Sequence, residues 1–327
     1  MSRSTSVVTG VLCGVIANLI WGLAFVIPVM VPASDGVELA LGRYLFFGVV
    51  SLGIVIFTRG AGTRGLDRRV WLTALIFAFA GHLGYYFFLV EGVIHVGSPV
   101  TTVIIGTMPV SVALTGNWAR KEFPFSRLLL PLGSITAGLI LVNVTEFDWR
   151  TASSGHSALN WVIGIASALM ALGLWTWYAV ANARFLRSHP EISSYNWSTL
   201  MGICTLVLSL FALPAASVSG EIHIGRGSAI FPILIGSLVL GVLVSWVGTV
   251  LWNRSSGSVP ISIAGQLTVV EIIAGLVYVF VWTRRVPSLV ELAGIALLIG
   301  GVLLAIQRTR SSPVAEAELT GEAEMIS

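Results

Sequence analysis

Apolar residues run along almost the whole chain in long blocks, and short polar stretches separate these blocks. Most blocks hold about 20 residues, which is the length that an α-helix needs to cross roughly 30 Å of hydrocarbon. Backbone groups find no water inside a bilayer, so each block is expected to be a helix. The pattern predicts ten membrane-spanning helices, at residues 8–29, 38–57, 70–91, 99–118, 128–144, 161–186, 195–216, 229–252, 260–281 and 289–306.

The composition excludes a water-soluble globular protein. Hydrophobic residues make up 56% of the 327 residues, and charged residues make up only 10%. A soluble domain carries roughly a quarter of charged residues. Cys13 and Cys204 both lie inside predicted spans, so they predict neither a disulfide framework nor a metal site. The first apolar run lacks a clear cleavage site and is expected to remain as a span.

Basic residues concentrate in alternate connections between the predicted spans. With a cytoplasmic N-terminus, 13 lysines and arginines fall on the cytoplasmic side and 4 fall on the outer side. This asymmetry predicts that both termini are cytoplasmic and that the number of spans is even. The net charge of +3 therefore reports topology, and no nucleic-acid partner is expected. Residues 311–327 are polar and acidic and are expected to form a disordered cytoplasmic tail.

The two halves of the chain share the same order of spans. We predict one five-helix unit at residues 1–150 and a second at residues 151–310, and Thr107 and Thr268 occupy matching positions in them. Because five is odd, the second unit enters the membrane from the opposite side. Such inverted repeats are typical of secondary transporters. The predicted fold is therefore an all-α integral membrane protein with two inverted five-helix repeats around a central cavity.

Several spans carry aromatic and polar side chains at helical spacing. In the third span, His82, Tyr85 and Tyr86 lie at positions i, i+3 and i+4, and so share one face. Polar groups in the membrane interior usually face other helices or a water-filled cavity. Helix packing also explains each of these faces, and both interpretations stay open. The predicted substrate-binding residues, drawn from six spans, are Asn18, Trp21, His82, Tyr85, Tyr86, Met108, Trp175, Tyr178, Ser245, Trp246 and Gln266.

Three charged residues within the predicted spans are candidates for coupling or gating. Glu271 lies near the centre of the ninth span, where a carboxylate is by default a functional hypothesis. A structural hydrogen bond to a neighbouring helix is the alternative for this residue. Glu91 and Arg43 lie near the outer ends of the third and second spans, where they could pair as an interfacial or gating contact.

Four short motifs in the first half of the chain resemble those of a known family. They are the stretch NLIWG at residues 18–22, Arg43, the stretch GSP at residues 97–99 and the stretch MPV at residues 108–110. In these motifs and in its predicted spans, the chain is similar to the EamA-type members of the drug/metabolite transporter superfamily. Its aromatic spans look most similar to the YddG-type exporters of aromatic and other amino acids. The resemblance implies a secondary transporter that exports amino acids across the bacterial inner membrane by alternating access, without catalysis and without a cofactor.

Other functions predict features that the chain lacks. Small multidrug exporters of the same superfamily depend on a carboxylate in the first span, and the first span here has none. A drug exporter of another kind stays an alternative. An intramembrane enzyme would need a metal cluster or a nucleophile–base pair, which five scattered histidines do not supply. We therefore expect an amino-acid solute, a surrounding lipid bilayer and a monomeric protein.

Overall fold

The computed structural model describes residues 3–31, 36–120, 124–144, 158–218 and 230–310. Within these ranges the chain is helical and contains no strand, which confirms the predicted all-α class. Nine helical segments of the described residues are long and apolar enough to cross a membrane, and a further apolar stretch, Leu289–Leu304, is shorter. The tail predicted at residues 311–327 lies outside the described residues.

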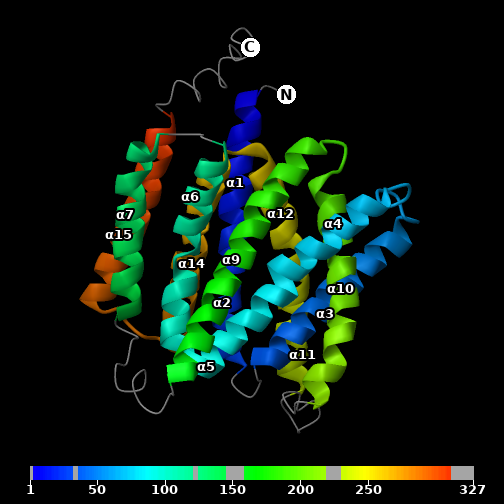
Figure 1. Cartoon of the computed structure of the whole chain (residues 1–327), viewed down its shortest axis with the longest axis horizontal. Coiled ribbons are helices and arrows are strands. Elements are labelled where there is room, and N and C mark those ends of the chain that lie inside the picture. Colours follow the sequence, from blue (N-terminus) through cyan, green and yellow to red (C-terminus); the bar gives the residue numbers. More distant parts are fainter. Residues whose placement is uncertain (1–2, 32–35, 121–123, 145–157, 219–229, 311–327) are drawn as a thin grey trace.

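Several of these crossings are built from two or three helical segments in series (Figure 1). The segments are α1 (Arg3–Trp21), α2 (Leu23–Met30), α3 (Gly36–Phe57), α4 (Arg68–Ala78), η1 (Phe79–Leu83), α5 (Gly84–Gly106), α6 (Met108–Arg120), α7 (Phe125–Val144), α9 (Ala158–Ser188), α10 (Ser194–Val218), α11 (Ile230–Val239), η3 (Leu240–Val247), α12 (Gly248–Ser258), α13 (Ile261–Leu267), α14 (Val269–Thr283) and α15 (Leu289–Arg310). In Figure 1, α1 begins and α15 ends at the same end of the bundle, as an even number of crossings requires.

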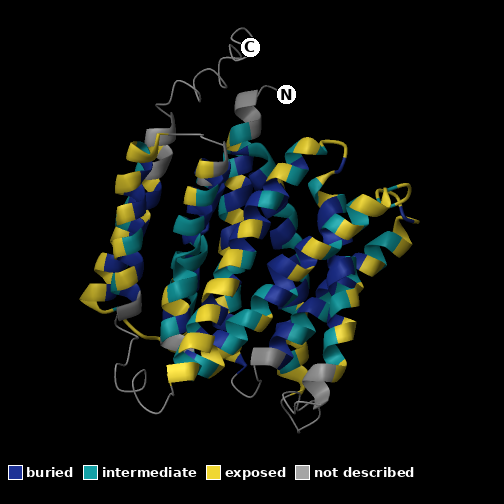
Figure 2. Cartoon of the chain, viewed as in Figure 1, coloured by how far each residue is buried: buried dark blue, intermediate teal, exposed yellow. Residues whose placement is uncertain are grey.

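The outer faces of the helices are apolar. Phe211, Leu129 and Leu159 are 79%, 70% and 67% exposed. A water-soluble monomer rarely exposes so much contiguous apolar surface, whereas lipid chains solvate it. Figure 2 shows buried residues between the helices and exposed residues on their outer faces. The chain is therefore a multi-pass membrane protein.

Glycines bring α7 and α15 into close contact along one side of the bundle (Figure 1). A Cβ atom added at Gly138 would lie only 2.7 Å from the carbonyl oxygen of Gly294. Conversely, a Cβ atom added at Gly294 would lie 3.0 Å from the carbonyl oxygen of Gly138. Small residues at such contacts let two helix backbones approach within a membrane, where packing drives helix association.

The helices are interrupted at matched places in the two halves of the chain. π-Helical segments begin at Phe79 in the first half and at Leu240 in the second. Thr107 and Thr268 lie as far apart in sequence as Phe79 and Leu240 do. Breaks at these two threonines divide α5 from α6 and α13 from α14. Each of these threonines donates a hydrogen bond from Oγ1 to the carbonyl oxygen three residues earlier, over 2.7 and 2.6 Å. The two breaks therefore have the same local chemistry.

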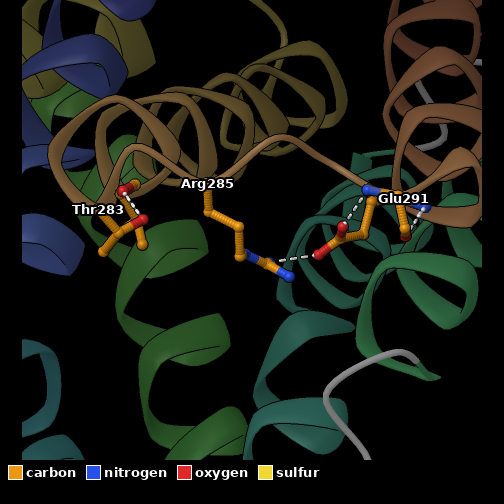
Figure 3. Close-up of polar contacts among 5 residues, drawn as sticks. Thr283, Arg285 and Glu291 are labelled. Carbon is orange, nitrogen blue, oxygen red and sulfur yellow. Dashed lines mark hydrogen bonds and ion pairs between the residues drawn. The ribbon is translucent and has the colours of Figure 1, made fainter.

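An ion pair and a helix cap hold the connection between α14 and α15 (Figure 3). Arg285 Nη2 lies 2.5 Å from Glu291 Oε1, and Glu291 is 1% exposed. The backbone N–H of Ser288 donates to Glu291 Oε2 over 2.6 Å, and the backbone N–H of Glu291 donates to Ser288 Oγ over 3.3 Å. This reciprocal pair is a capping box, which fixes the start of α15.

Candidate substrate site

Three tryptophans from three helices form a cluster inside the bundle. Trp21 ends α1, Trp175 lies in α9, and Trp252 lies in α12. Their ring centroids are 5.3 Å apart for Trp21 and Trp252, 6.0 Å for Trp175 and Trp252, and 6.5 Å for Trp21 and Trp175. These spacings are favourable for aromatic pairs. The structure thus brings together two predicted site residues and adds Trp252, which the sequence reasoning missed. We call these three residues the tryptophan cluster.

Tyr178 and His82 extend this aromatic surface toward α3. The Tyr178 ring centroid lies 6.3 Å from that of Trp175 and 6.2 Å from that of His82. His82 Nδ1 lies 2.9 Å from Thr205 Oγ1, and the His82 carbonyl oxygen accepts a hydrogen bond from the Tyr44 hydroxyl over 3.4 Å. His82 is therefore a buried, partnered histidine at the edge of the aromatic surface.

Opposite charges from the two halves of the chain meet near this surface. Arg43 of α3 donates from Nε to Ser245 Oγ over 2.7 Å, and its guanidinium lies 5.5 Å from the Tyr44 ring centroid. Arg43 interacts electrostatically with Glu271 of α14, and Tyr85 of α5 interacts with both charges. Both charged residues are described, and no ion pair within 4.0 Å joins them. We call Arg43, Tyr85, Ser245 and Glu271 the charged site.

The residues around the charged site are only partly buried, although they lie among packed helices. Arg43, Tyr85, Tyr86 and Glu271 all keep some accessible surface. The Tyr86 ring lies edge-on to Tyr44, with 6.4 Å between the ring centroids. Within the described residues, the Glu271 carboxylate accepts no hydrogen bond. The arrangement thus offers a cation, an anion and phenol groups beside an aromatic surface.

Three other predicted residues lie in the packed interior of the bundle. Met108, the first residue of α6, packs against the apolar core that includes Trp175. Asn18 and Gln266 are fully buried, with 0% and 1% exposure. Asn18 donates from Nδ2 to the carbonyl oxygen of Gly14 over 2.7 Å, within its own helix. Both amides therefore lie behind the accessible surface.

Trp246 points away from the other predicted residues. Its Nε1 donates to Thr199 Oγ1 of α10 over 3.3 Å, and its ring lies 5.2 Å from that of Tyr195. Trp246 lies within the π-helical segment η3, where the ordinary helical spacing does not hold. Trp246 and its neighbour Ser245, both predicted site residues, therefore contact different partners.

The pairing that was considered for Glu91 and Arg43 is not observed. Glu91 lies 3.5 Å from His95 Nδ1, one turn further along α5. Arg43 lies about two turns inside α3, because α3 begins at Gly36, and it turns toward Ser245. Arg43 is therefore a residue of the charged site, and Glu91 is not.

A buried hydrogen-bond network joins α9, α10 and α12. Asn182 donates to Asn253 Oδ1 over 2.7 Å, and Asn253 donates to Ser198 Oγ over 2.8 Å. Trp197 Nε1 donates to Asn182 Oδ1 over 2.7 Å. All four residues are 0% exposed, and we call them the asparagine network. Beside it, Arg187 donates to carbonyl oxygens at the end of α12. The sequence reasoning missed this network.

The chain is similar to proteins that are already known. Residues 8–144 match the EamA-like transporter family. The inner membrane protein YtfF of Escherichia coli (strain K12) is 36% identical over 326 residues, which cover 95% of this chain and 98% of that protein. A probable terminal-alkyne amino-acid exporter of Streptantibioticus cattleyicolor is 22% identical over 306 residues, which cover 90% of this chain and 95% of that protein. The fold is similar to a solved crystal structure with a TM-score of 0.73 and 17% identity, covering 95% of this chain and 100% of the other.

A helical bundle whose outer surface is apolar and whose helices are long enough to cross a membrane defines a multi-pass membrane protein. Within that class, this chain belongs to the EamA-like transporter family. The predicted resemblance to the drug/metabolite transporter superfamily is thereby confirmed. Members of this family are transporters and not enzymes.

Proposed function

We propose that the protein exports amino acids with apolar side chains across the bacterial inner membrane. The observation that carries this proposal is the charged site beside the tryptophan cluster, where Arg43 and Glu271 offer opposite charges next to an aromatic surface. An amino acid is a zwitterion with a side chain, and it matches both features. The amino-acid exporter among the relatives supports the same solute class, as does the resemblance to the YddG-type exporters.

The mechanism that we propose is alternating access by two inverted five-helix repeats, residues 1–150 and 151–310, around a central cavity. The π-helical segments and the breaks at Thr107 and Thr268 support a common architecture for the two halves, because the members of each pair lie equally far apart in sequence. In this scheme α15 is the tenth span and both termini are cytoplasmic. The charged site takes Arg43 from the first repeat and Glu271 from the second, so a movement of one repeat against the other changes it directly.

Purified protein in liposomes tests the proposed solute class. We expect liposomes that are loaded with unlabelled phenylalanine to accumulate radiolabelled phenylalanine from outside by exchange. Protein-free liposomes should not, because the charged backbone of an amino acid crosses lipid very slowly. The same exchange with and without an imposed pH gradient measures coupling to protons. Exchange of a lipophilic cation such as tetraphenylphosphonium, with no exchange of any amino acid, would identify a drug exporter and contradict the proposal.

Reporter fusions test the proposed topology. A green fluorescent protein joined after residue 310 is expected to fluoresce, because that reporter folds in the cytoplasm. Alkaline phosphatase inserted after residue 286, in the connection between α14 and α15, is expected to be active, because it needs the oxidising exterior. Phosphatase activity from a fusion after residue 310 would reverse the assigned orientation.

A further inference from the structure

We infer that Arg43 and Glu271 bind the two charged groups of one zwitterionic α-amino acid. Arg43 binds the carboxylate through its Nη groups, and Glu271 binds the ammonium. The inference rests on the proposed amino-acid transport and specifies how the solute is recognised.

Arg43 is oriented to bind a carboxylate. Its Nε donates to Ser245 Oγ, which fixes the plane of the guanidinium, while the Tyr44 ring lies beside it. Within the described residues, its two Nη groups donate no hydrogen bond. A guanidinium presents its N–H groups as a planar fork that matches the two oxygens of a carboxylate.

Glu271 lies on α14, a helix that packs against the end of α1. Ala274, one turn after Glu271, packs so closely on Gly22 that a Cβ atom added there would lie 2.7 Å from the Ala274 Cβ. The preceding residue, Trp21, donates from Nε1 to the carbonyl oxygen of Val244, directly before Ser245. Arg43 of α3 is bonded to Ser245 of η3, and Glu271 belongs to α14, so both lie on segments that are tied to the end of α1.

The two charged side chains are not paired directly. They attract each other, but their charged atoms do not come within 4.0 Å. Unpaired charges are costly within a membrane, and a direct ion pair would have satisfied both. In an α-amino acid, a single carbon atom joins the ammonium to the carboxylate, so the solute can contact both side chains at once. An ammonium also supplies three N–H donors to a carboxylate that accepts no other hydrogen bond among the described residues.

The surroundings place the solute side chain as well. Trp21 is partly accessible, and Met108 is the partly buried residue that begins α6. Both pack against the same apolar core. A solute held by Arg43 and Glu271 would direct an apolar side chain to this surface.

Three related compounds separate the roles of the two charges. Phenylalanine carries both charged groups, its methyl ester lacks the carboxylate, and N-acetylphenylalanine lacks the ammonium. Binding is followed through the change in tryptophan fluorescence of the purified protein. We expect Arg43→Gln to weaken phenylalanine binding by roughly tenfold or more, which is the loss of a charge-assisted hydrogen bond. Binding of the methyl ester should change far less, because the ester carries no negative charge for the guanidinium to pair with.

The second variant gives the reciprocal pattern. We expect Glu271→Gln to weaken binding of phenylalanine and its methyl ester, and to leave N-acetylphenylalanine unchanged. Arg43→Lys keeps the charge and should keep a preference for phenylalanine over the ester. Arg184→Gln and Glu191→Gln, which change exposed charges near the connection between α9 and α10, should leave all three compounds unaffected. Melting temperatures of all variants, measured in parallel, identify any that do not fold.

Other results would overturn the inference. If a folded Arg43→Gln or Glu271→Gln protein binds all three compounds equally more weakly, the replaced charge has a structural role. If Glu271→Gln keeps phenylalanine binding and loses only the proton dependence of transport, Glu271 couples protons and does not bind the solute. If the wild type exchanges phenylalanine and both variants bind it normally, the recognition scheme is wrong while the proposed function stands. A wild type that binds and exchanges no amino acid fails the proposed function itself.

Discussion

Replacing Trp175 with alanine is expected to reduce amino-acid exchange by about tenfold or more, whereas Trp177→Ala leaves it near the wild-type level. Trp175 is 8% exposed and contacts Trp21, Trp252 and Tyr178. Trp177 lies two residues further along the same helix, is 47% exposed and contacts Phe77 on another face. Tenfold corresponds to about 1.4 kcal/mol, which is within the range of one aromatic contact. Initial rates of exchange in liposomes with equal amounts of protein give the comparison.

A second substitution at position 175 separates the effect of a smaller side chain from the effect of a lost aromatic contact. Trp175→Phe keeps an aromatic ring and is expected to retain more exchange than Trp175→Ala. Thermal melting in detergent shows whether either variant has lost stability, since removal of a buried aromatic side chain from a core costs roughly 3–5 kcal/mol. If Trp175→Ala is less stable but exchanges phenylalanine at the wild-type rate, the tryptophan cluster serves packing alone.

Asn253→Ala is expected to lower the melting temperature of the purified protein. This change removes the acceptor for the Asn182 amide and the donor to the Ser198 hydroxyl. Asn182 and Ser198 are both fully buried. A buried polar group that loses its partner costs about 1–3 kcal/mol in soluble proteins, whereas interhelical hydrogen bonds in membranes average about 0.6 kcal/mol. With two groups affected, we expect a loss of about 1–4 kcal/mol.

A double replacement checks that the network is the cause. Asn182→Leu combined with Asn253→Leu should cost less than the sum of the two single changes, because each single change strands the other amide. Thr73→Ala is a suitable control, since Thr73 is partly exposed and bonds only within its own helix. Additive effects, or a melting temperature that Asn253→Ala does not change, would mean that the asparagine network adds little stability.

The spans and the helical class could be predicted because they depend on local properties. A bilayer admits only long apolar segments with internally bonded backbones, so the pattern of apolar residues is sufficient to find them. A break in the fourth span was also predictable, because Pro109 has no N–H to donate within a helix. The structure places the break at Thr107, so that Pro109 lies in the first turn of α6.

The direction in which each side chain points was harder to predict. Trp246 and His82 lie in π-helical segments, where the wider turn shifts the faces that a regular helix would present. The contact of Arg43 with Ser245 joins residues 202 positions apart in sequence, which no local pattern relates. The asparagine network joins residues 15 to 71 positions apart in sequence, and no local pattern relates them.

The break at Thr268 has an electrostatic consequence. It begins a new helix, α14, and Glu271 lies in the first turn of that helix. The first N–H groups of a helix carry a partial positive charge, which stabilises a nearby anion by roughly 0.3–1 kcal/mol. The matching break at Thr107 begins α6, whose first turn has no acidic residue. The break occurs in both halves of the chain, but the negative charge occurs in only one of the two first turns. A zwitterion that meets one cation and one anion in this setting can bind in one orientation only, with its ammonium toward α14.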